Sequence, residues 1–266
     1  MDSYEEHDLT PMKKAVLACV AGIRTPEQRR SLESVVEAGQ LHQLREMARC
    51  NKVEALVGAA IQEAYGNDFL DSGWLDLLDA NEKRVVRALD LASETVEILH
   101  KKGFPTAVIE GGGTLLASTL PLSSYGAGDF DLIANPADIN EVWSLLEAEG
   151  FQPKDRRSRP TARKEFYFDF GQGQGTWLEV GAQIFDRMWV PISIPNLTAD
   201  WLGRARNSPR VPSLSVLDAS DALALVAVHT SMHSFVRSPY LRLHLDVHRT
   251  VVDNSIDWDR FMGNVC

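Results

Sequence analysis

The sequence predicts an α+β fold in which a small mixed sheet is flanked by N-terminal and C-terminal helical regions. Apolar residues recur at helical spacing through most of residues 11–100. After Phe104 the pattern changes to short β-prone runs broken by glycines, and from Ser220 it becomes helical again. We therefore expect a helical region at 1–103, an α/β core at 104–215 and a second helical region at 216–266.

In the first region, two segments have the apolar spacing of helices, Leu41–Ala64 and Asn81–Lys102. Gly103 follows the second as a C-terminal stop. The stretch Asn67–Gly73 between them is typical of a connector.

The expected core begins with a short β-prone run at Thr106–Glu110, which Gly111–Gly113 interrupts. A short helix is compatible with Leu115–Leu120, and Tyr125–Gly128 has the composition of a turn. Strict alternation then predicts a strand at Asp129–Ala134, with its acids on one face and Phe130 and Leu132 on the other.

The remaining elements follow in order along the chain. We expect a helix at Asp138–Gly150, a hairpin of strands Glu165–Phe170 and Thr176–Val180, and two helices at Ala222–Val236 and Tyr240–Val252. The glycines of 171–175 suit the hairpin turn, and Pro239 separates the last two helices.

Composition and charge exclude several classes of protein. The chain has 266 residues, 44% of them hydrophobic, enough for one large domain or two small ones. It lacks the roughly 20 consecutive apolar residues of a membrane span and the basic start of a secretory signal. Its three cysteines form neither a metal pattern nor a disulfide framework, so we expect a cytoplasmic protein.

The formal net charge of −10 argues against a protein that coats long nucleic acid, because neutralisation of phosphates supplies most of that affinity. One stretch departs from this balance, since Lys154–Lys164 (KDRRSRPTARK) holds six basic residues and one acid. It is either a solvated loop or an anion-binding loop, in which Arg156, Arg157 and Arg159 bind a phosphate substrate.

The chemistry is expected at Asp129 and Asp131. Residues two apart in a strand point to the same face, so the two carboxylates lie side by side and repel each other. A divalent cation relieves that repulsion, and Mg²⁺ or Mn²⁺ prefers such oxygen ligands. Glu179, from the later strand, supplies a third carboxylate for a metal site, although an exposed strand acid is the simpler alternative.

Gly111, Gly112 and Gly113 lie just upstream of the acids. Without side chains, they allow the backbone to approach a phosphate closely, although three glycines are more often a flexible turn. The ordered set is more informative than its parts: a strand, a glycine turn, a short helix, an Asp-x-Asp strand, a helix and an acidic strand.

This set resembles the nucleotidyltransferase superfamily, whose fold is similar to that of DNA polymerase β. It is closer still to a bacterial family of uncharacterised nucleotidyltransferases. The most specific stretch is Gly128–Phe151, where GDFDLIANPAD precedes LLEAEGF. The segments LREMARCNKVEALVGAAIQEA, HTSMH, LRLHLD and IDWDRF also match, so the resemblance covers nearly the whole chain. Three positions depart from the family pattern: Glu110 replaces a Lys, Tyr125 an Arg, and Gly181 follows where a His is usual.

The resemblance implies a metal-dependent transfer of a nucleoside monophosphate from a nucleoside triphosphate to an acceptor. Asp129, Asp131 and Glu179 would bind Mg²⁺ or Mn²⁺, and the three glycines would hold the triphosphate. The charge favours a small molecule, peptide or protein as acceptor over long nucleic acid, and no membrane is implied. The departures motivate an alternative, a catalytically decayed scaffold that binds a peptide, protein or nucleotide. A toxin-like modifier of tRNA or protein is a third possibility.

Histidines and tryptophans offer weaker signals. His229 and His233 stand four apart, as do His244 and His248, which permits zinc binding on a helix face. We favour a packed or hydrogen-bonded role for them. Trp177 and other tryptophans suit base stacking, but burial is their commoner use.

Overall fold

The computed structural model describes residues 9–23, 25–125, 129–154, 163–171, 174–183, 197–236 and 241–265. The chain divides into two compact units. The first unit comprises Met1–Glu82, Ser123–Gly126 and Tyr240–Arg242, and the second comprises Lys83–Leu122, Ala127–Pro239 and Leu243–Cys266. None of the described helices is both long and apolar enough to cross a bilayer.

The first unit is helical, as expected. Its elements are α1 (Pro11–Ala21), α2 (Pro26–Glu37), α3 (Leu41–Cys50), α4 (Glu54–Tyr65), the 3₁₀ turn η1 (Asn67–Phe69) and the start of α5 (Ser72–Lys101). The expected helix at 41–64 is therefore two helices. Lys52 adopts a φ of +57° between them, a left-handed conformation that no α-helix accommodates.

Helix α5 begins nine residues earlier than its apolar pattern indicated, inside the expected connector. The Asp71 carboxylate accepts a hydrogen bond from the Trp74 amide at 2.9 Å and so caps the first turn. Trp74 is 1% exposed and lies against Gly58 of α4, where a Cβ atom would come within 2.5 Å of the indole. The glycine thus permits the close approach of the indole to α4.

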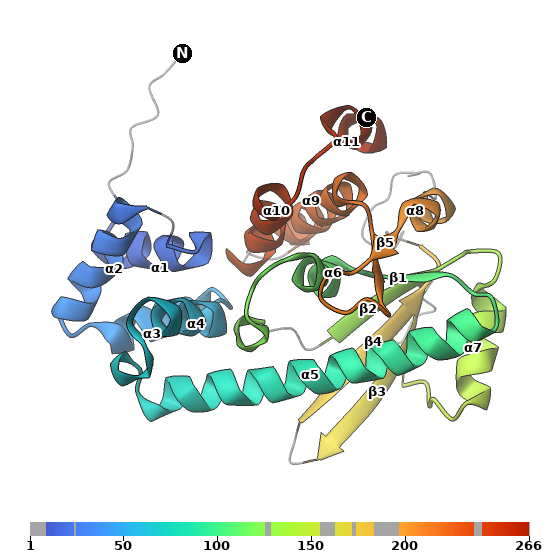
Figure 1. The fold of residues 1–266 in the computed structure, drawn as a ribbon, viewed down its shortest axis with the longest axis horizontal. Helices are drawn as coiled ribbons and strands as arrows, with labels where there is room; N and C mark the ends of the chain where they lie inside the picture. The colour runs from blue at the N-terminus through green and yellow to red at the C-terminus, as the bar shows by residue number, and fades with distance from the viewer. Residues whose placement is uncertain are drawn as a thin grey trace. The chain divides into compact units, whose positions relative to one another are not determined.

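The second unit contains the sheet (Figure 1). Among the described residues, the sheet has six strands in the order β3-β4-β2-β1-β6-β5. β1 pairs with β2 antiparallel, β2 with β4 parallel, β3 with β4 as an antiparallel hairpin, and β1 with β6 parallel. The expected α+β class with a mixed sheet is confirmed. The strands are β1 (Thr106–Ile109), β2 (Asp129–Ala134), β3 (Arg163–Gly171), β4 (Gln174–Gly181), β5 (Arg206–Asn207) and β6 (Ser215–Val216).

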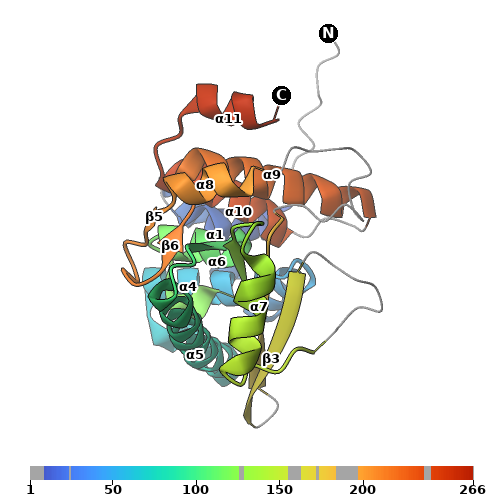
Figure 2. The same ribbon diagram turned by 90° about the vertical axis from the view of Figure 1, so that its right-hand side faces the viewer.

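Helices cover both faces of this sheet. The helices of this unit are the rest of α5, α6 (Glu110–Ala117), α7 (Ile139–Ala148), α8 (Thr198–Arg204), α9 (Ala219–Val236), α10 (Leu241–Asp253) from Leu243 on, and α11 (Trp258–Val265). Of the 3₁₀ turn η2 (Leu122–Ser124), only Leu122 belongs to this unit. On one face, Ile109 and Ile133 form a buried cluster with Trp201 of α8 and Leu225 of α9. On the other, the Trp143 indole of α7 donates to the Val180 carbonyl at 2.9 Å. Figure 2 shows α7 well apart from α8 and α9.

The three consecutive glycines do not form the expected turn, because α6 begins at Glu110 and includes them. Glu110 itself changes the chain direction, with a φ of +55°. The glycines instead allow close packing. A Cβ atom at Gly112 would lie 3.0 Å from Val108 Cγ1, and one at Gly113 would lie 2.9 Å from the Val108 carbonyl oxygen.

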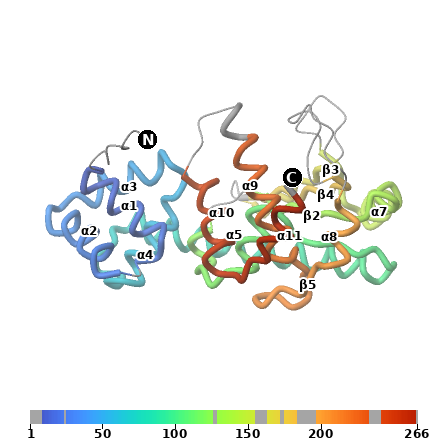
Figure 3. The backbone as a smooth tube through the Cα atoms, turned by 90° about the horizontal axis from the view of Figure 1, so that it is seen from above, coloured from blue at the N-terminus to red at the C-terminus, as the bar shows by residue number. Residues whose placement is uncertain are grey.

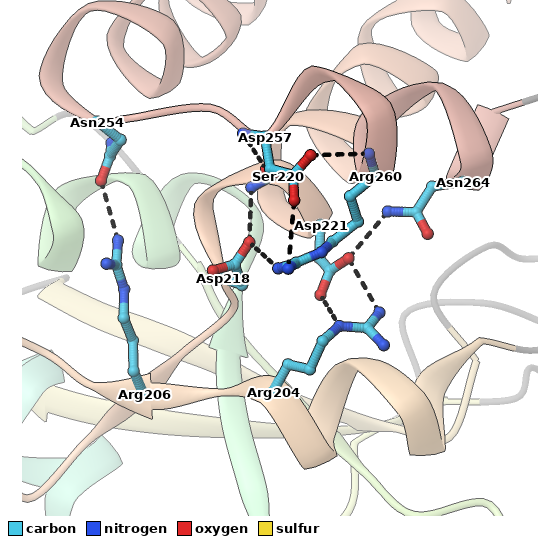
Figure 4. Close-up of polar contacts among 9 residues, drawn as sticks. All are labelled: Arg204, Arg206, Asp218, Ser220, Asp221, Asn254, Asp257, Arg260 and Asn264. Carbon is cyan, nitrogen blue, oxygen red and sulfur yellow. Dashed lines mark hydrogen bonds and ion pairs between the residues drawn. The ribbon is translucent and has the colours of Figure 1, made fainter.

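Helix α11 packs against α9 (Figure 3), and a polar network attaches it to the rest of the unit (Figure 4). The carboxylate of Asp221 in α9 is fully buried and accepts two bonds from Arg204, at 2.9 and 3.0 Å, and one from Asn264, at 2.8 Å. Arg260 donates to Asp218 at 3.0 Å. We call this the α11 network. Each of its two buried or half-buried aspartates pairs with a different arginine, and Arg260 also pairs with the exposed Asp257, at 3.4 Å.

Candidate functional site

The strand register brings together the acids that the sequence singled out. Asp131 of β2 lies directly beside Glu179 of β4, and Asp129 lies beside Trp177. Register partners share a face of the sheet, so all three predicted carboxylates are on one face. The hairpin extends the row, because Glu165 of β3 is the partner of Glu179. We call Glu165, Glu179 and Asp131 the acid row.

The acid row is buried, with exposed fractions of 4% for Glu165, 4% for Glu179 and 7% for Asp131. Glu165 is not among the site residues predicted from the sequence. The signal for it was present, since Glu165 alternates with aromatic residues in EFYFDF and the hairpin turn fixes its register against Glu179. Asp129, at the start of β2, is half-buried.

The guanidinium of Arg163, the first residue of β3, lies among these acids. Its Nη1 is 3.0 Å from Asp131 Oδ1 and 3.7 Å from Glu179 Oε2. Its Nη2 donates to Glu110 Oε1 at 2.9 Å. Arg163 is the next-to-last residue of the basic stretch Lys154–Lys164. One member of that stretch therefore enters the site as a counter-ion to the carboxylates.

Glu110 links the acid row to α9. Its second carboxylate oxygen lies 3.3 Å from His229 Nδ1. A left-handed backbone is uncommon for a residue other than glycine and costs on the order of 1 kcal/mol or more. Glu110 adopts this conformation at the junction between β1 and α6, and its carboxylate lies between Arg163 and His229. We call Arg163, Glu110, Asp131, Glu179 and His229 the Arg163 cluster.

Electrostatics differ sharply among the members of this cluster. Burial, reinforced by Glu110 and Glu179, raises the pKa of Asp131 well above its usual value despite Arg163. Burial also opposes ionisation of Glu110, but Arg163 and His229 outweigh it and hold the pKa of Glu110 well below its usual range. One guanidinium therefore does not offset three carboxylates, and Asp131 is a member of the cluster whose charged form is strongly disfavoured.

The two bases respond in the complementary direction. Burial alone would lower the pKa of Arg163, but Glu110, Asp131 and Glu179 raise it, so the guanidinium remains charged. Burial likewise disfavours the charged form of His229, yet the neighbouring Glu110 raises its pKa above the ordinary value.

An aromatic pair lies beside Asp129 on the same face. Tyr167 and Trp177 are register partners, with ring centroids 4.9 Å apart. The Lys154 ammonium lies over both rings, 4.6 Å from the Tyr167 centroid and 5.9 Å from that of Trp177. A Cβ atom at Gly175 would come within 2.3 Å of the Tyr167 hydroxyl oxygen, so the glycine lets the ring lie across β4. Both aromatic side chains are half-buried.

The donor chemistry of the acids suits a hard divalent cation, because every donor is a carboxylate oxygen. The present arrangement does not, since the Arg163 guanidinium lies between the carboxylates. Over the described part of the chain, no three His, Cys, Asp or Glu side chains are placed so that they could hold a metal ion. A cation would fit these residues only after Arg163 has moved.

The remaining predicted residues have different positions. Arg156, Arg157 and Arg159 lie outside the described residues, as does the side chain of His233. Lys164, next to Arg163, forms an ion pair with Glu147 of α7, away from the acid row. The three glycines lie in the first turn of α6, next to Glu110. The contact of His229 with Glu110 is a hydrogen-bonded role, as favoured over zinc.

This arrangement is typical of a nucleotidyltransferase fold: a mixed sheet in which an Asp-x-Asp strand lies beside a strand with a third acid. The profile of the uncharacterised nucleotidyltransferase family matches residues 37–265, and the chain belongs to that family. A comparison with curated proteins finds no match.

Proposed function

We propose that the protein transfers a nucleoside monophosphate from a nucleoside triphosphate to an acceptor, with the help of Mg²⁺ or Mn²⁺. The observation that carries the proposal is the register of Asp131 against Glu179, with Asp129 on the same face, in a member of a nucleotidyltransferase family. This register places three carboxylates from two adjacent strands close together on one face of the sheet.

Each residue has a role in this proposal. Asp129, Asp131 and Glu179 hold the divalent cation, which neutralises phosphate charge and orients an in-line displacement when bound. The first turn of α6, with Gly111–Gly113, offers backbone N–H groups to the triphosphate. An acceptor oxygen bonds to the α-phosphorus as the bond to the departing pyrophosphate breaks, and Glu179 takes the acceptor proton.

The aromatic pair supports a nucleotide as the ligand. Trp177 is the register neighbour of Asp129 and precedes Glu179 by two residues on the same face of β4, so it lies beside the proposed metal ligands. Stacking of a base on an aromatic ring is worth about 1–3 kcal/mol and tolerates any base. We propose that the nucleobase stacks against Trp177, in exchange for the Lys154 contact.

The test is incubation of the protein with each labelled nucleoside triphosphate and Mg²⁺, scored for pyrophosphate release and for label transfer to the protein itself. Pyrophosphate release that depends on metal and is abolished by EDTA supports the proposal. Failure with all four common triphosphates, both without and with extracts of candidate peptide or small-molecule acceptors, contradicts it.

One observation favours a second candidate, a binding module without turnover. Arg163 already gives the carboxylates a cation of the protein's own. In that case the acids maintain the fold rather than bind metal. A protein that neither binds Mn²⁺ nor releases pyrophosphate would favour this candidate.

A further inference from the structure

We infer that Arg163 is an exchange residue of the site: it neutralises the carboxylates before ligand binds, and it transfers to the phosphates of the substrate when the metal–nucleotide complex enters. The inference rests on the proposed function and adds a residue that binds the triphosphate. It also explains how a site whose acids are engaged by an arginine receives a metal.

Arg163 and a divalent cation compete for the same oxygens. The guanidinium donates to Asp131 at 3.0 Å and lies 3.7 Å from Glu179, and both are proposed metal ligands. A cation bound to these carboxylates would lie directly beside the guanidinium. Like charges so close together in a buried site repel strongly, so binding of one displaces the other.

Arg163 also lies where the phosphates of the substrate are expected. Its other nitrogen is held at 2.9 Å by Glu110, the first residue of α6. The next three residues are the glycines at the N-terminal turn of that helix, which is favourable for anions. A guanidinium released from Asp131 therefore needs only a local change of its side chain to reach an anion bound there.

The guanidinium of Arg163 matches phosphate in hydrogen-bonding geometry and in charge. The guanidinium carries five N–H donors in a planar fork, which pairs with phosphate oxygens as well as with carboxylates. A metal–triphosphate complex brings both signs of charge at once. The carboxylates exchange the guanidinium for the metal, while the guanidinium exchanges the carboxylates for phosphate. Each buried charge thus keeps a partner throughout, which makes the exchange feasible in a buried site.

Two affinities should then change in opposite directions on removal of this one side chain. Arg163→Met keeps the length of the side chain and removes its charge. By calorimetry, Mn²⁺ alone should bind the variant roughly tenfold more tightly than the wild type, within the range usual for coupled binding. A non-hydrolysable triphosphate with Mg²⁺ should bind roughly tenfold more weakly, because a phosphate partner is lost.

Two further variants control the experiment. Arg163→Lys keeps the charge without the fork, so its affinity for Mn²⁺ should stay near that of the wild type while triphosphate binding weakens less than in Arg163→Met. It also serves if Arg163→Met fails to fold, which the melting temperature reports. Arg204→Met removes an arginine that pairs with a buried aspartate outside the site and should change neither affinity.

Opposite shifts for Mn²⁺ and the triphosphate support the inference. Unchanged Mn²⁺ affinity, or a loss of both affinities together, would overturn it and make Arg163 a permanent structural partner of the acids. Because both readouts measure binding, they are separate from the test of the proposed function. Absence of pyrophosphate release removes the proposed turnover, whereas absence of opposite shifts removes the exchange.

Discussion

The Arg163 cluster and the α11 network are both built from arginines and carboxylates, yet they differ in how the charges are matched. In the α11 network, Asp221 accepts three hydrogen bonds from Arg204 and Asn264, and Asp218 pairs with Arg260. In the Arg163 cluster, the carboxylates of Glu110, Asp131 and Glu179 converge on one guanidinium.

This difference separates a network suited to stability from one suited to binding. Where a buried carboxylate makes all of its hydrogen bonds, removal of either partner lowers the stability of the folded protein. A carboxylate that shares its cation and has a raised pKa, such as Asp131, is stabilised by additional positive charge. The charge balance of the Arg163 cluster therefore favours a cationic ligand more than that of the α11 network does.

Asp131→Asn should have the largest effect of the substitutions that test this difference between the two networks. It preserves the shape of the side chain and removes one carboxylate from the Arg163 cluster. We expect turnover to fall by about 100-fold or more, because the lost carboxylate no longer neutralises the metal. The metal-free protein should keep its stability or gain slightly, because repulsion from Glu110 and Glu179 is relieved. Pyrophosphate release and urea unfolding without metal measure the two effects. A marked loss of stability with unchanged activity would assign Asp131 a structural role.

The fold class and the acids of β2 and β4 could be predicted from the sequence. Strict alternation in DFDLIA predicted β2 and its acidic face, and the element order pointed to Glu179 as the third acid. Glu110 was noticed only as a departure from the family pattern. The glycines after it were misread as a turn, because periodicity does not reveal that Glu110 takes the left-handed conformation.

The partners of the carboxylates could not be predicted from the sequence, because they are far away along the chain. Arg163 is 32 residues from Asp131 and 53 from Glu110, and His229 is on another helix, so only the folded chain brings them together. The strands β5 and β6 have two residues each, too short for any periodicity. The basic stretch stands out in the sequence by its charge, but nothing in its composition distinguishes Arg163 from its neighbours.

The matched substitution in the α11 network is Asp221→Asn. We expect it to lower the free energy of unfolding by about 2 kcal/mol, because a buried carboxylate loses its charge-assisted bonds and Arg204 loses its partner. Arg204 is partly exposed, which limits the loss. Turnover per folded molecule should be unchanged. Denaturant midpoints and specific activity measure these effects, and a stability equal to that of the wild type would remove the distinction between the two networks.

Trp177→Leu tests whether the surface beside the Arg163 cluster binds the nucleobase of the triphosphate. We expect roughly tenfold weaker triphosphate binding, the loss of one stacking contact, with Mn²⁺ affinity unchanged. The control is Trp143→Leu, on the opposite face of the sheet, where the indole bonds to Val180. That change should affect stability alone. Equal nucleotide affinity in wild type and Trp177→Leu would return Trp177 to a packing role.

The smallest expected effect concerns the outer contact of the cluster, between His229 and Glu110. Burial opposes the charged imidazole, but Glu110 raises the pKa of His229 above its unfolded value of about 6.5. A raised folded pKa means that the stabilising contribution is complete below the unfolded pKa and disappears as the pH rises through the folded pKa. His229→Gln should therefore cost about 1 kcal/mol near pH 6 and almost nothing near pH 9.

Urea unfolding of both proteins across this pH range measures the difference, and His244→Gln, at an exposed position of α10, is the control. A cost of His229→Gln that is the same at both ends of the range would mean that the contact is neutral packing. A cost that grows toward low pH would mean that Glu110 is shared between two cations, Arg163 and the imidazolium. In that case Glu110 remains paired when Arg163 leaves it, so the exchange at the acid row need not leave a buried carboxylate without a partner.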